Sequence, residues 1–154
     1  MSQQAPLYRA DITTFGDPYG SWYSWVKIQE IGRERSIVVK GSGSRSRSRY
    51  EEPMIFERAA ARDAYFTKVK DSQIGRGRSI NEDRTKARAG LTEKELVDYL
   101  TENALSPEHA MRLMAAVSLL TGNATVPQGD TPAPAAEVAP QMNFATMAPS
   151  FGSF

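Results

Sequence analysis

Hydrophobic and polar residues alternate along much of the first third of the chain. Residues 7–15 alternate loosely and end at residues 16–20, a dense cluster of turn formers. Residues 22–31 are rich in aromatic and β-branched side chains, and Val26 and Ile28 fall on one face of an extended backbone. This pattern predicts two strands joined by a turn.

A third apolar run covers residues 35–40, and the glycine-containing residues 41–43 end it. Residues 50–56 can return as another strand, at an edge of the sheet because Pro53 has no N–H to donate. Serine and arginine alternate between these two strands, in residues 44–49. We therefore expect an antiparallel sheet of three to five strands that carries a flexible basic loop.

The period changes to that of a helix in residues 57–72, which are dense in good helix formers. Ala59, Tyr65, Phe66 and Val69 fall on one stripe of this helix. An apolar stripe of this kind needs a partner surface, so we expect this one amphipathic helix to cover the sheet. The fold class that follows is α+β.

Two further helices have clear start signals. Thr92 and Glu95 match a capping box, which predicts a helix over residues 92–103. Ser106 precedes a proline and begins a second helix, which should end at Gly122. Together they predict a C-terminal helical hairpin that packs on the sheet or on another subunit, because two short helices bury little area alone.

Side chains of the second helix of this hairpin allow two more predictions. Leu113, Met114 and Val117 repeat at helical spacing, and we expect Met111 and Met114 to be adaptable core residues. His109 is the only histidine and has no cysteine or carboxylate at ligand spacing. It is weak evidence for catalysis or for metal binding.

The composition divides the chain into three parts: a basic sheet-plus-helix domain at residues 1–90, the hairpin at 91–122 and a tail at 123–154. The tail is rich in Pro, Ala, Thr, Gln and Ser, which predicts disorder. Large apolar side chains near its end are typical of a peptide that docks in a partner's groove or promotes self-association. The candidate partner-binding residues are Phe144, Met147, Phe151 and Phe154.

The net charge of +1 hides a division of charge along the chain. Residues 1–90 hold 17 Lys and Arg against 11 Asp and Glu, a net +6, whereas residues 91–154 hold 2 against 7, a net −5. Clustered cations attract polyanions, so the first part should meet an anionic partner. The absence of cysteine excludes disulfides and thiolate chemistry, and no window is apolar enough to cross a membrane, so we expect a cytoplasmic protein.

The heptapeptide Ile-Gly-Arg-X-Arg-Ser-Ile occurs twice, at residues 31–37 and 74–80. Each copy sets two arginines on one side of an extended chain behind a glycine, which suggests a phosphate grip, and we expect both pairs on one face of the fold. Residues 81–90 add a second basic arm. Aromatic side chains close to these cations could stack on bases. The candidate nucleic-acid-binding residues are Trp22, Tyr23, Arg33, Arg35, Lys40, Arg45, Arg47, Arg49, Tyr50, Arg76 and Arg78.

Catalytic motifs give no positive signal. The chain has no phosphate loop of the Gly-X-X-X-X-Gly-Lys type, no His-Glu-X-X-His and no nucleophile elbow. Acidic residues cluster at Glu51, Glu52, Glu57 and Asp63, but their spacing matches no known ligand pattern. We therefore expect a protein that is not an enzyme and that uses neither a cofactor nor a metal.

The order of strands, basic hairpin and amphipathic helix resembles small nucleic-acid-binding modules of the WGR, Whirly and PUR families. The resemblance covers about half of the chain and rests on residues 23–26, residues 31–33 and the run from Phe56 through Phe66 to Gly77; the Trp-Gly-Arg triplet itself is absent. It implies binding of DNA or RNA across a sheet by aromatic and basic side chains.

We therefore expect a non-catalytic protein that binds single-stranded RNA, or single-stranded DNA, with low sequence specificity. Its tail would recruit a partner or promote self-association, and the sequence is compatible with a homo-oligomer. It is compatible with a cellular or a viral origin as well. The alternative is a structural or assembly protein in which the hairpin and the tail make protein contacts while the arginines meet acidic protein.

Overall fold

The computed structural model describes residues 4–122, which form one antiparallel sheet and three α-helices. Strands and helices follow one another along the chain as β1 (Tyr8–Gly16), β2 (Trp22–Glu30), β3 (Ser36–Ser44), β4 (Arg47–Tyr50), β5 (Met54–Phe56), α1 (Ala59–Gly75), β6 (Ser79–Ile80), the 3₁₀ turn η1 (Glu82–Arg84), β7 (Lys86–Leu91), α2 (Glu93–Glu102) and α3 (Pro107–Thr121). The α+β class and the antiparallel pairing that the sequence predicts are confirmed.

The sheet has seven strands, so the expected number of three to five is wrong. Its centre is the long meander β1–β2–β3, and each outer edge of that meander pairs with two short strands. On one edge β4 pairs with the end of β3 and β5 with its start; on the other edge β6 and β7 divide β1 in the same way. Residues 51–53 separate β4 from β5 on one edge, and η1 separates β6 from β7 on the other. Four of the seven strands are therefore short edge strands, which the apolar pattern of the sequence does not resolve.

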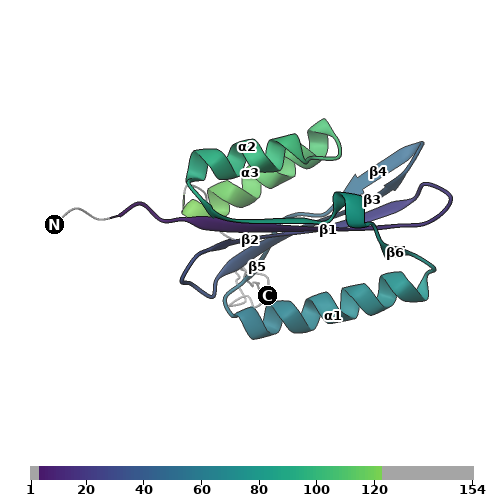
Figure 1. Cartoon of the computed structure of the whole chain (residues 1–154), viewed down its shortest axis with the longest axis horizontal. Coiled ribbons are helices and arrows are strands. Elements are labelled where there is room, and N and C mark those ends of the chain that lie inside the picture. Colours follow the sequence, from purple (N-terminus) through teal and green to yellow (C-terminus); the bar gives the residue numbers. More distant parts are fainter. Residues whose placement is uncertain (1–3, 123–154) are drawn as a thin grey trace, which may run out of the picture.

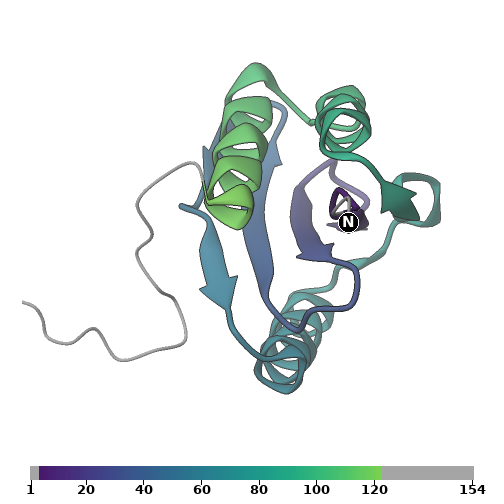
Figure 2. The same ribbon diagram turned by 90° about the vertical axis from the view of Figure 1, so that its left-hand side faces the viewer.

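Helices cover both faces of this sheet (Figures 1 and 2). The helical hairpin of α2 and α3 lies on one face, called here the hairpin face, and α1 lies on the other, called the α1 face. The hairpin packs on the sheet of its own chain through the larger hydrophobic cluster. The expectation of one covering helix is therefore incomplete, since three helices share the task.

The core under the hairpin is apolar and well sealed. It takes alternate side chains from every long strand, as the two-residue period of a strand requires, together with one stripe each of α2 and α3. Its fully buried members with the largest side chains are Ile28, Ile37, Ile55, Leu91, Leu96, Leu100 and Leu113. This cluster contains more buried residues than the one under α1, and burial of apolar area is the main favourable contribution to stability.

The core under α1 is smaller and contains more aromatic and polar groups. Trp25 meets Tyr65 and Phe66 in edge-on contacts, with ring centroids 5.7 and 5.1 Å apart. Of the stripe predicted from sequence, only Val69 is fully buried, whereas both aromatic residues are partly exposed. The other buried residues of α1 are polar, Arg62 and Gln73. This helix is therefore attached by fewer apolar contacts than the hairpin.

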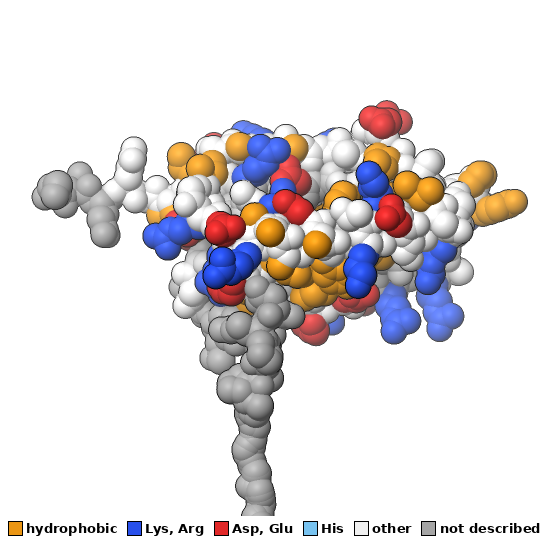
Figure 3. Space-filling model, turned by 90° about the horizontal axis from the view of Figure 1, so that it is seen from below, with side chains coloured by type: hydrophobic (Ala, Val, Ile, Leu, Met, Phe, Trp, Pro, Cys, Tyr) orange, Lys and Arg blue, Asp and Glu red, His pale blue; other side chains and the backbone are white. Residues whose placement is uncertain are grey.

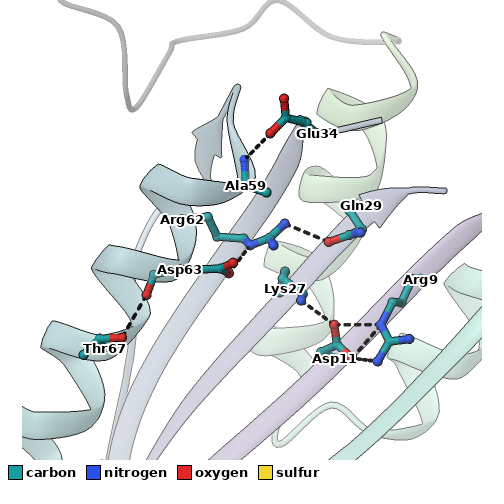
Figure 4. Close-up of polar contacts among 9 residues, drawn as sticks. All are labelled: Arg9, Asp11, Lys27, Gln29, Glu34, Ala59, Arg62, Asp63 and Thr67. Carbon is teal, nitrogen blue, oxygen red and sulfur yellow. Dashed lines mark hydrogen bonds and ion pairs between the residues drawn. The ribbon is translucent and has the colours of Figure 1, made fainter. Parts of the chain in front are cut away.

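Polar contacts hold the first half of α1 against the sheet (Figure 4). Arg62 donates through Nη1 to the side-chain oxygen of Gln29 on β2 at 2.7 Å. Beside it on the same face, Lys27 and Arg9 both bind the carboxylate of Asp11, at 2.7 and 3.0 Å. Burial alone would raise the pKa of Asp11, but the hydrogen bonds from Arg9 and Lys27 outweigh it and lower that pKa.

The predicted helix starts are confirmed. Thr92 and Glu95 form the capping box at the start of α2, with the Thr92 side chain accepting from the Glu95 N–H at 3.2 Å. Ser106 caps α3 by accepting the N–H of His109 at 3.1 Å. At the far end of α3, Gly122 adopts a φ of +83°, a left-handed conformation that favours glycine. These signals are local, which is why the sequence places both helices accurately.

Met111 and Met114 do not belong to the core, contrary to prediction. Their exposed fractions are 69% and 50%, because the stripe that faces the sheet runs through His109, Leu113 and Ala116 instead. Since successive residues of a helix turn by about 100°, Met114 lies well off that stripe. The structure thus leaves a methionine-bearing surface on α3 without cover from residues 4–122.

Candidate nucleic-acid interface

The serine and arginine alternation forms a tight β-hairpin instead of a flexible loop. β3 does not end at Gly41 as predicted but continues to Ser44, and a two-residue turn leads into β4. The cross-strand pairs are Gly41 with Tyr50, Ser42 with Arg49, Gly43 with Ser48 and Ser44 with Arg47. Because side chains alternate along a strand, Arg47 and Arg49 share the α1 face, as the alternation predicts. Arg45 lies in the turn.

Two glycines of β3 are required by the rings that cover them on the hairpin face. A Cβ at Gly43 would stand 2.5 Å from the Trp22 ring and 2.8 Å from the backbone oxygen of Arg47. A Cβ at Gly41 would stand 2.5 Å from the Tyr50 ring. Both distances are shorter than contact between atoms allows, so these glycines are the places where the aromatic rings lie flat on the sheet. Glycine here indicates close approach and not the end of a strand.

Three arginines from two distant segments line one cleft on the α1 face. Arg47 and Arg49 come from β4, and Arg78 comes from the segment between α1 and β6. The cleft measures about 450 Å³ and its floor is formed by the small residues Ser42 and Gly43. We call it the arginine cleft; its lining residues are Ser42, Gly43, Ser44, Arg47, Ser48, Arg49 and Arg78.

The arginine cleft is positively charged because three arginines and no carboxylate are among its lining residues. Arg47 and Arg49 are exposed and form no ion pair or side-chain hydrogen bond within residues 4–122. Arg78 is held in place: it donates to Gln73 Oε1 at 2.5 Å and lies 3.9 Å from Asp17 Oδ2. Seen from the α1 side, lysine and arginine side chains project from the end of the molecule that bears this hairpin (Figure 3). One fixed and two mobile guanidinium groups thus meet at a concave surface.

The two copies of the heptapeptide lie at opposite ends of α1, so the expectation that they form one grip is wrong. The first copy forms the β2–β3 turn beside the start of α1, where Glu34 accepts the N–H of Ala59 at 3.3 Å (Figure 4). The second copy forms the end of α1 and the turn that follows, where Gly77 has a φ of +85°. α1 contains 17 residues, which corresponds to a length of roughly 25 Å.

The arginines of the first copy are partly neutralised within the fold. Arg33 Nε lies 3.7 Å from Glu30, and Arg35 Nε lies 3.4 Å from Glu57. Of the second copy, Arg78 lines the arginine cleft, whereas Arg76 is exposed at the end of α1 and is not among the residues that line it. Only the second copy therefore joins the arginine cleft.

Lys40 is not available to a ligand, which corrects its place among the predicted binding residues. It is 6% exposed beneath α1, where it donates to the Tyr65 hydroxyl at 2.6 Å and pairs with Glu51 at 3.0 Å. Burial alone would lower the pKa of Lys40, but the bonds to Tyr65 and Glu51 more than offset it and raise that pKa. Lys40 is a charged anchor for α1.

The three predicted stacking residues have different roles. Tyr23 belongs to the core under α1, 6.2 Å from Phe15, and burial raises the pKa of its hydroxyl. Tyr50 is covered on the hairpin face. Its ring stacks on that of His109, with the ring centroids 4.9 Å apart, and its hydroxyl accepts a hydrogen bond from the Ser106 hydroxyl at 2.7 Å. Trp22 remains partly exposed beside Tyr50. All three side chains are half-buried, and Trp22 lines a depression on the hairpin face.

No protein-family model, curated protein or solved structure matches this chain. The assignment of function therefore rests on the geometry of residues 4–122. In that part of the chain no helix is long and apolar enough to span a membrane, and no cluster of acidic, histidine or cysteine side chains could hold a metal ion. The four predicted docking residues of the tail lie outside it.

Residues 81–90 do not form a free basic arm. They form η1 and β7, and β7 pairs with β1 through Lys86, Ala87, Arg88 and Leu91. Arg84 and Lys86 are exposed; Arg84 lines a depression of the hairpin face together with the partly exposed Trp22, and Lys86 lines the adjoining one. Neither is among the predicted site residues; Arg84 ends η1, whereas Lys86 begins β7, and the alternation of basic with small residues is the signal that could have placed Lys86 on a strand.

Proposed function

We propose that this protein binds single-stranded nucleic acid, RNA or DNA, through the arginine cleft. The observation that supports the proposal best is the convergence of Arg47, Arg49 and Arg78, from segments about 30 residues apart, on one concave surface whose lining residues include no carboxylate. Guanidinium groups bind phosphate through two parallel hydrogen bonds, which favours this residue type at such a surface.

The shape of the arginine cleft favours contacts to a strand's backbone over contacts to its bases. Serines at its floor and rim offer hydroxyl donors, and the mobile side chains of Arg47 and Arg49 can follow phosphates of different spacing. Arg45, in the turn, extends this surface toward the β1–β2 turn, where its Nε comes within 3.8 Å of the place that a Cβ on Gly20 would occupy. Contacts of this kind position a strand and give low sequence specificity.

Replacing Arg45, Arg47 and Arg49 together by alanine should weaken binding of a labelled 20-nucleotide RNA or DNA strand roughly 100-fold at low salt. The reason is that each lost charge-assisted bond to phosphate contributes about 1.5–3 kcal/mol, while the three side chains do not all bind at once. The logarithm of affinity should also fall less steeply with the logarithm of salt, by roughly 1.4–2 in slope. Fluorescence anisotropy at several salt concentrations measures both.

The matched control removes the same charge from the other end of α1. In Arg33→Ala, Arg35→Ala, Arg58→Ala, three arginines are lost near the β2–β3 turn, and the affinity measured at about 0.1 M salt should change less than about threefold, because these charges lie farther from the arginine cleft than the Debye length of about 10 Å. Equal weakening by the two triple variants, or a wild-type affinity in the hairpin variant, would show that the arginine cleft is not the binding site.

A second candidate function is assembly, and the exposed face of α3 supports it. Met111 and Met114 present flexible apolar side chains to solvent at 69% and 50% exposure, and methionine is common at adaptable protein contacts. If this face joins copies of the chain, the wild type should show a mass in solution of at least twice 17.0 kDa, and Met111→Lys with Met114→Lys should return it to the monomer. Light scattering after size-exclusion chromatography measures this, and a monomeric wild type at high concentration would rule the candidate out.

A further inference from the structure

A second cleft lies on the hairpin face, on the opposite side of the sheet from the arginine cleft. The helical hairpin covers only part of that face, and the ends of the central strands extend past the α2–α3 connection (Figure 1). Two adjoining depressions of about 290 and 310 Å³ occupy the uncovered part and share Thr14, Arg84 and Leu105. We call them together the tryptophan cleft, because Trp22 lines one of them.

The floor of the tryptophan cleft is polar although it belongs to the sheet. Thr14 of β1 and Ser24 of β2 occupy core positions, with exposed fractions of 2% and 0%, yet both have hydroxyl side chains. The Ser24 Oγ has no hydrogen-bond partner within the described chain. An unmet buried hydroxyl is costly, and a polar group seated on this floor would give it a partner.

The two walls of the tryptophan cleft differ in chemistry. One wall is basic: Arg84, at the end of η1, and Lys86, at the start of β7, are exposed and form no ion pair within residues 4–122. The other wall is aromatic, where Trp22 lies flat over Gly43. The carboxylates present are Glu102, at the end of α2, and Asp17, whose Oδ1 already accepts the N–H groups of Tyr19 and Ser21 at 2.9 Å.

We propose that the tryptophan cleft binds a nucleoside monophosphate, with its phosphate on Arg84 and Lys86 and its base against Trp22. A free phosphate would use the basic wall and leave the aromatic wall without a role, whereas a nucleotide uses both, and its sugar and base offer polar edges to the hydroxyl floor. The combined size suits a ligand of this class. The cleft shares none of its lining residues with the arginine cleft, so the inference does not depend on strand binding there.

Trp22 provides a direct test, because the other tryptophan, Trp25, is buried under α1 at 3% exposure. Titration with adenosine 5′-monophosphate at low salt should quench tryptophan emission in a saturable way, and Trp22→Phe should abolish the quenching. Arg84→Ala with Lys86→Ala should weaken the apparent affinity at least about tenfold, as loss of a charge-assisted contact implies. Adenosine without phosphate should bind the wild type at least about tenfold more weakly.

Two control variants remove the same charge elsewhere. Lys68→Ala with Lys70→Ala acts on α1, and Arg47→Ala with Arg49→Ala acts on the arginine cleft; both should leave the titration unchanged. An absence of saturable quenching, quenching that persists in Trp22→Phe, or an unaltered affinity in the Arg84 and Lys86 variant would overturn the inference. Failure of strand binding in the anisotropy experiment would leave this result unaffected, so the two proposals fail separately.

A competition experiment distinguishes the two sources of such a ligand. If the 20-nucleotide strand displaces adenosine 5′-monophosphate from Trp22, the tryptophan cleft accepts one nucleotide of a strand. If it does not, the cleft serves free nucleotides. Either result supports the site, and each assigns it a different ligand.

Discussion

Replacing Trp25 by alanine is expected to lower the free energy of unfolding by about 3–5 kcal/mol, the usual cost of removing a buried aromatic side chain. Trp25 is 3% exposed and meets both Tyr65 and Phe66, the two large aromatic residues of α1. α1 buries little else that is apolar, so the cavity would open directly beneath the helix. Urea unfolding followed by circular dichroism measures the loss of stability.

The effect should be local as well as global. Amide hydrogen exchange should accelerate more in α1 than in α2 and α3, because the hairpin packs on a separate cluster on the other face. Trp22→Ala is the matched control: it deletes the same side chain from a partly exposed site and should cost less than half as much. Trp25→Phe keeps part of the contact and should fall between them. Equal losses for the two alanine variants would contradict the account of how α1 is held.

Acidification should destabilise the protein through His109, beginning well above the range of ordinary carboxylates. Burial lowers the pKa of His109 to about 4, against 6.5 for an exposed histidine. Its Nδ1 accepts the N–H of Leu105 at 3.2 Å, and its ring stacks on Tyr50, so the folded state holds the neutral imidazole in an apolar site. Between pH 6.5 and pH 4, His109 is therefore protonated in the unfolded chain but neutral in the folded chain.

The sign follows from that difference. The contribution of the neutral His109 side chain to the free energy of unfolding is fully present above pH 6.5 and is lost as the pH falls toward 4. The loss is about 2 kcal/mol at pH 5 and about 3 kcal/mol near pH 4. Urea midpoints at pH 7.5 and pH 5 test this in a window where carboxylates contribute little. In His109→Asn, the amide oxygen can still accept from Leu105 but does not titrate, so the difference between the two pH values should largely disappear. A wild-type protein equally stable at both would show that the imidazole is not confined as described.

The elements that sequence predicts well are those specified by neighbouring residues. The start of α2 follows from a hydroxyl and a carboxylate three residues apart, and β1 and β2 follow from a two-residue period bounded by turn formers. These signals need no knowledge of the rest of the chain. The alternation of serine and arginine likewise predicts that Arg45, Arg47 and Arg49 face one way if the segment is extended; the pairing of β4 with β3 confirms this for Arg47 and Arg49, whereas Arg45 lies in the turn.

The misses come from partners distant in sequence. Gly41 and Gly43 indicate a break when read alone. In the structure the rings of Tyr50 and Trp22 occupy the space where a Cβ would stand, and β3 continues through both glycines to Ser44. β7 has few apolar residues and is a strand because the edge of β1 offers it hydrogen bonds. The position of Arg78 in the arginine cleft depends on the length of α1, because that helix crosses the sheet and ends three residues before Arg78. The sequence does not fix that length.

The two copies of the repeated heptapeptide adopt different backbone conformations. The residue at the one position that differs between them, Glu34 or Gly77, contacts or ends α1. Glu34 supplies a carboxylate to the first N–H of α1, and Gly77 supplies the left-handed residue that ends the same helix, with the Arg78 N–H returning to the Gln73 oxygen at 3.1 Å. A designer who grafted the seven residues into another scaffold would transfer no conformation with them. The conformation of each copy is set by the elements that it connects, β2 and β3 in the first and α1 and β6 in the second.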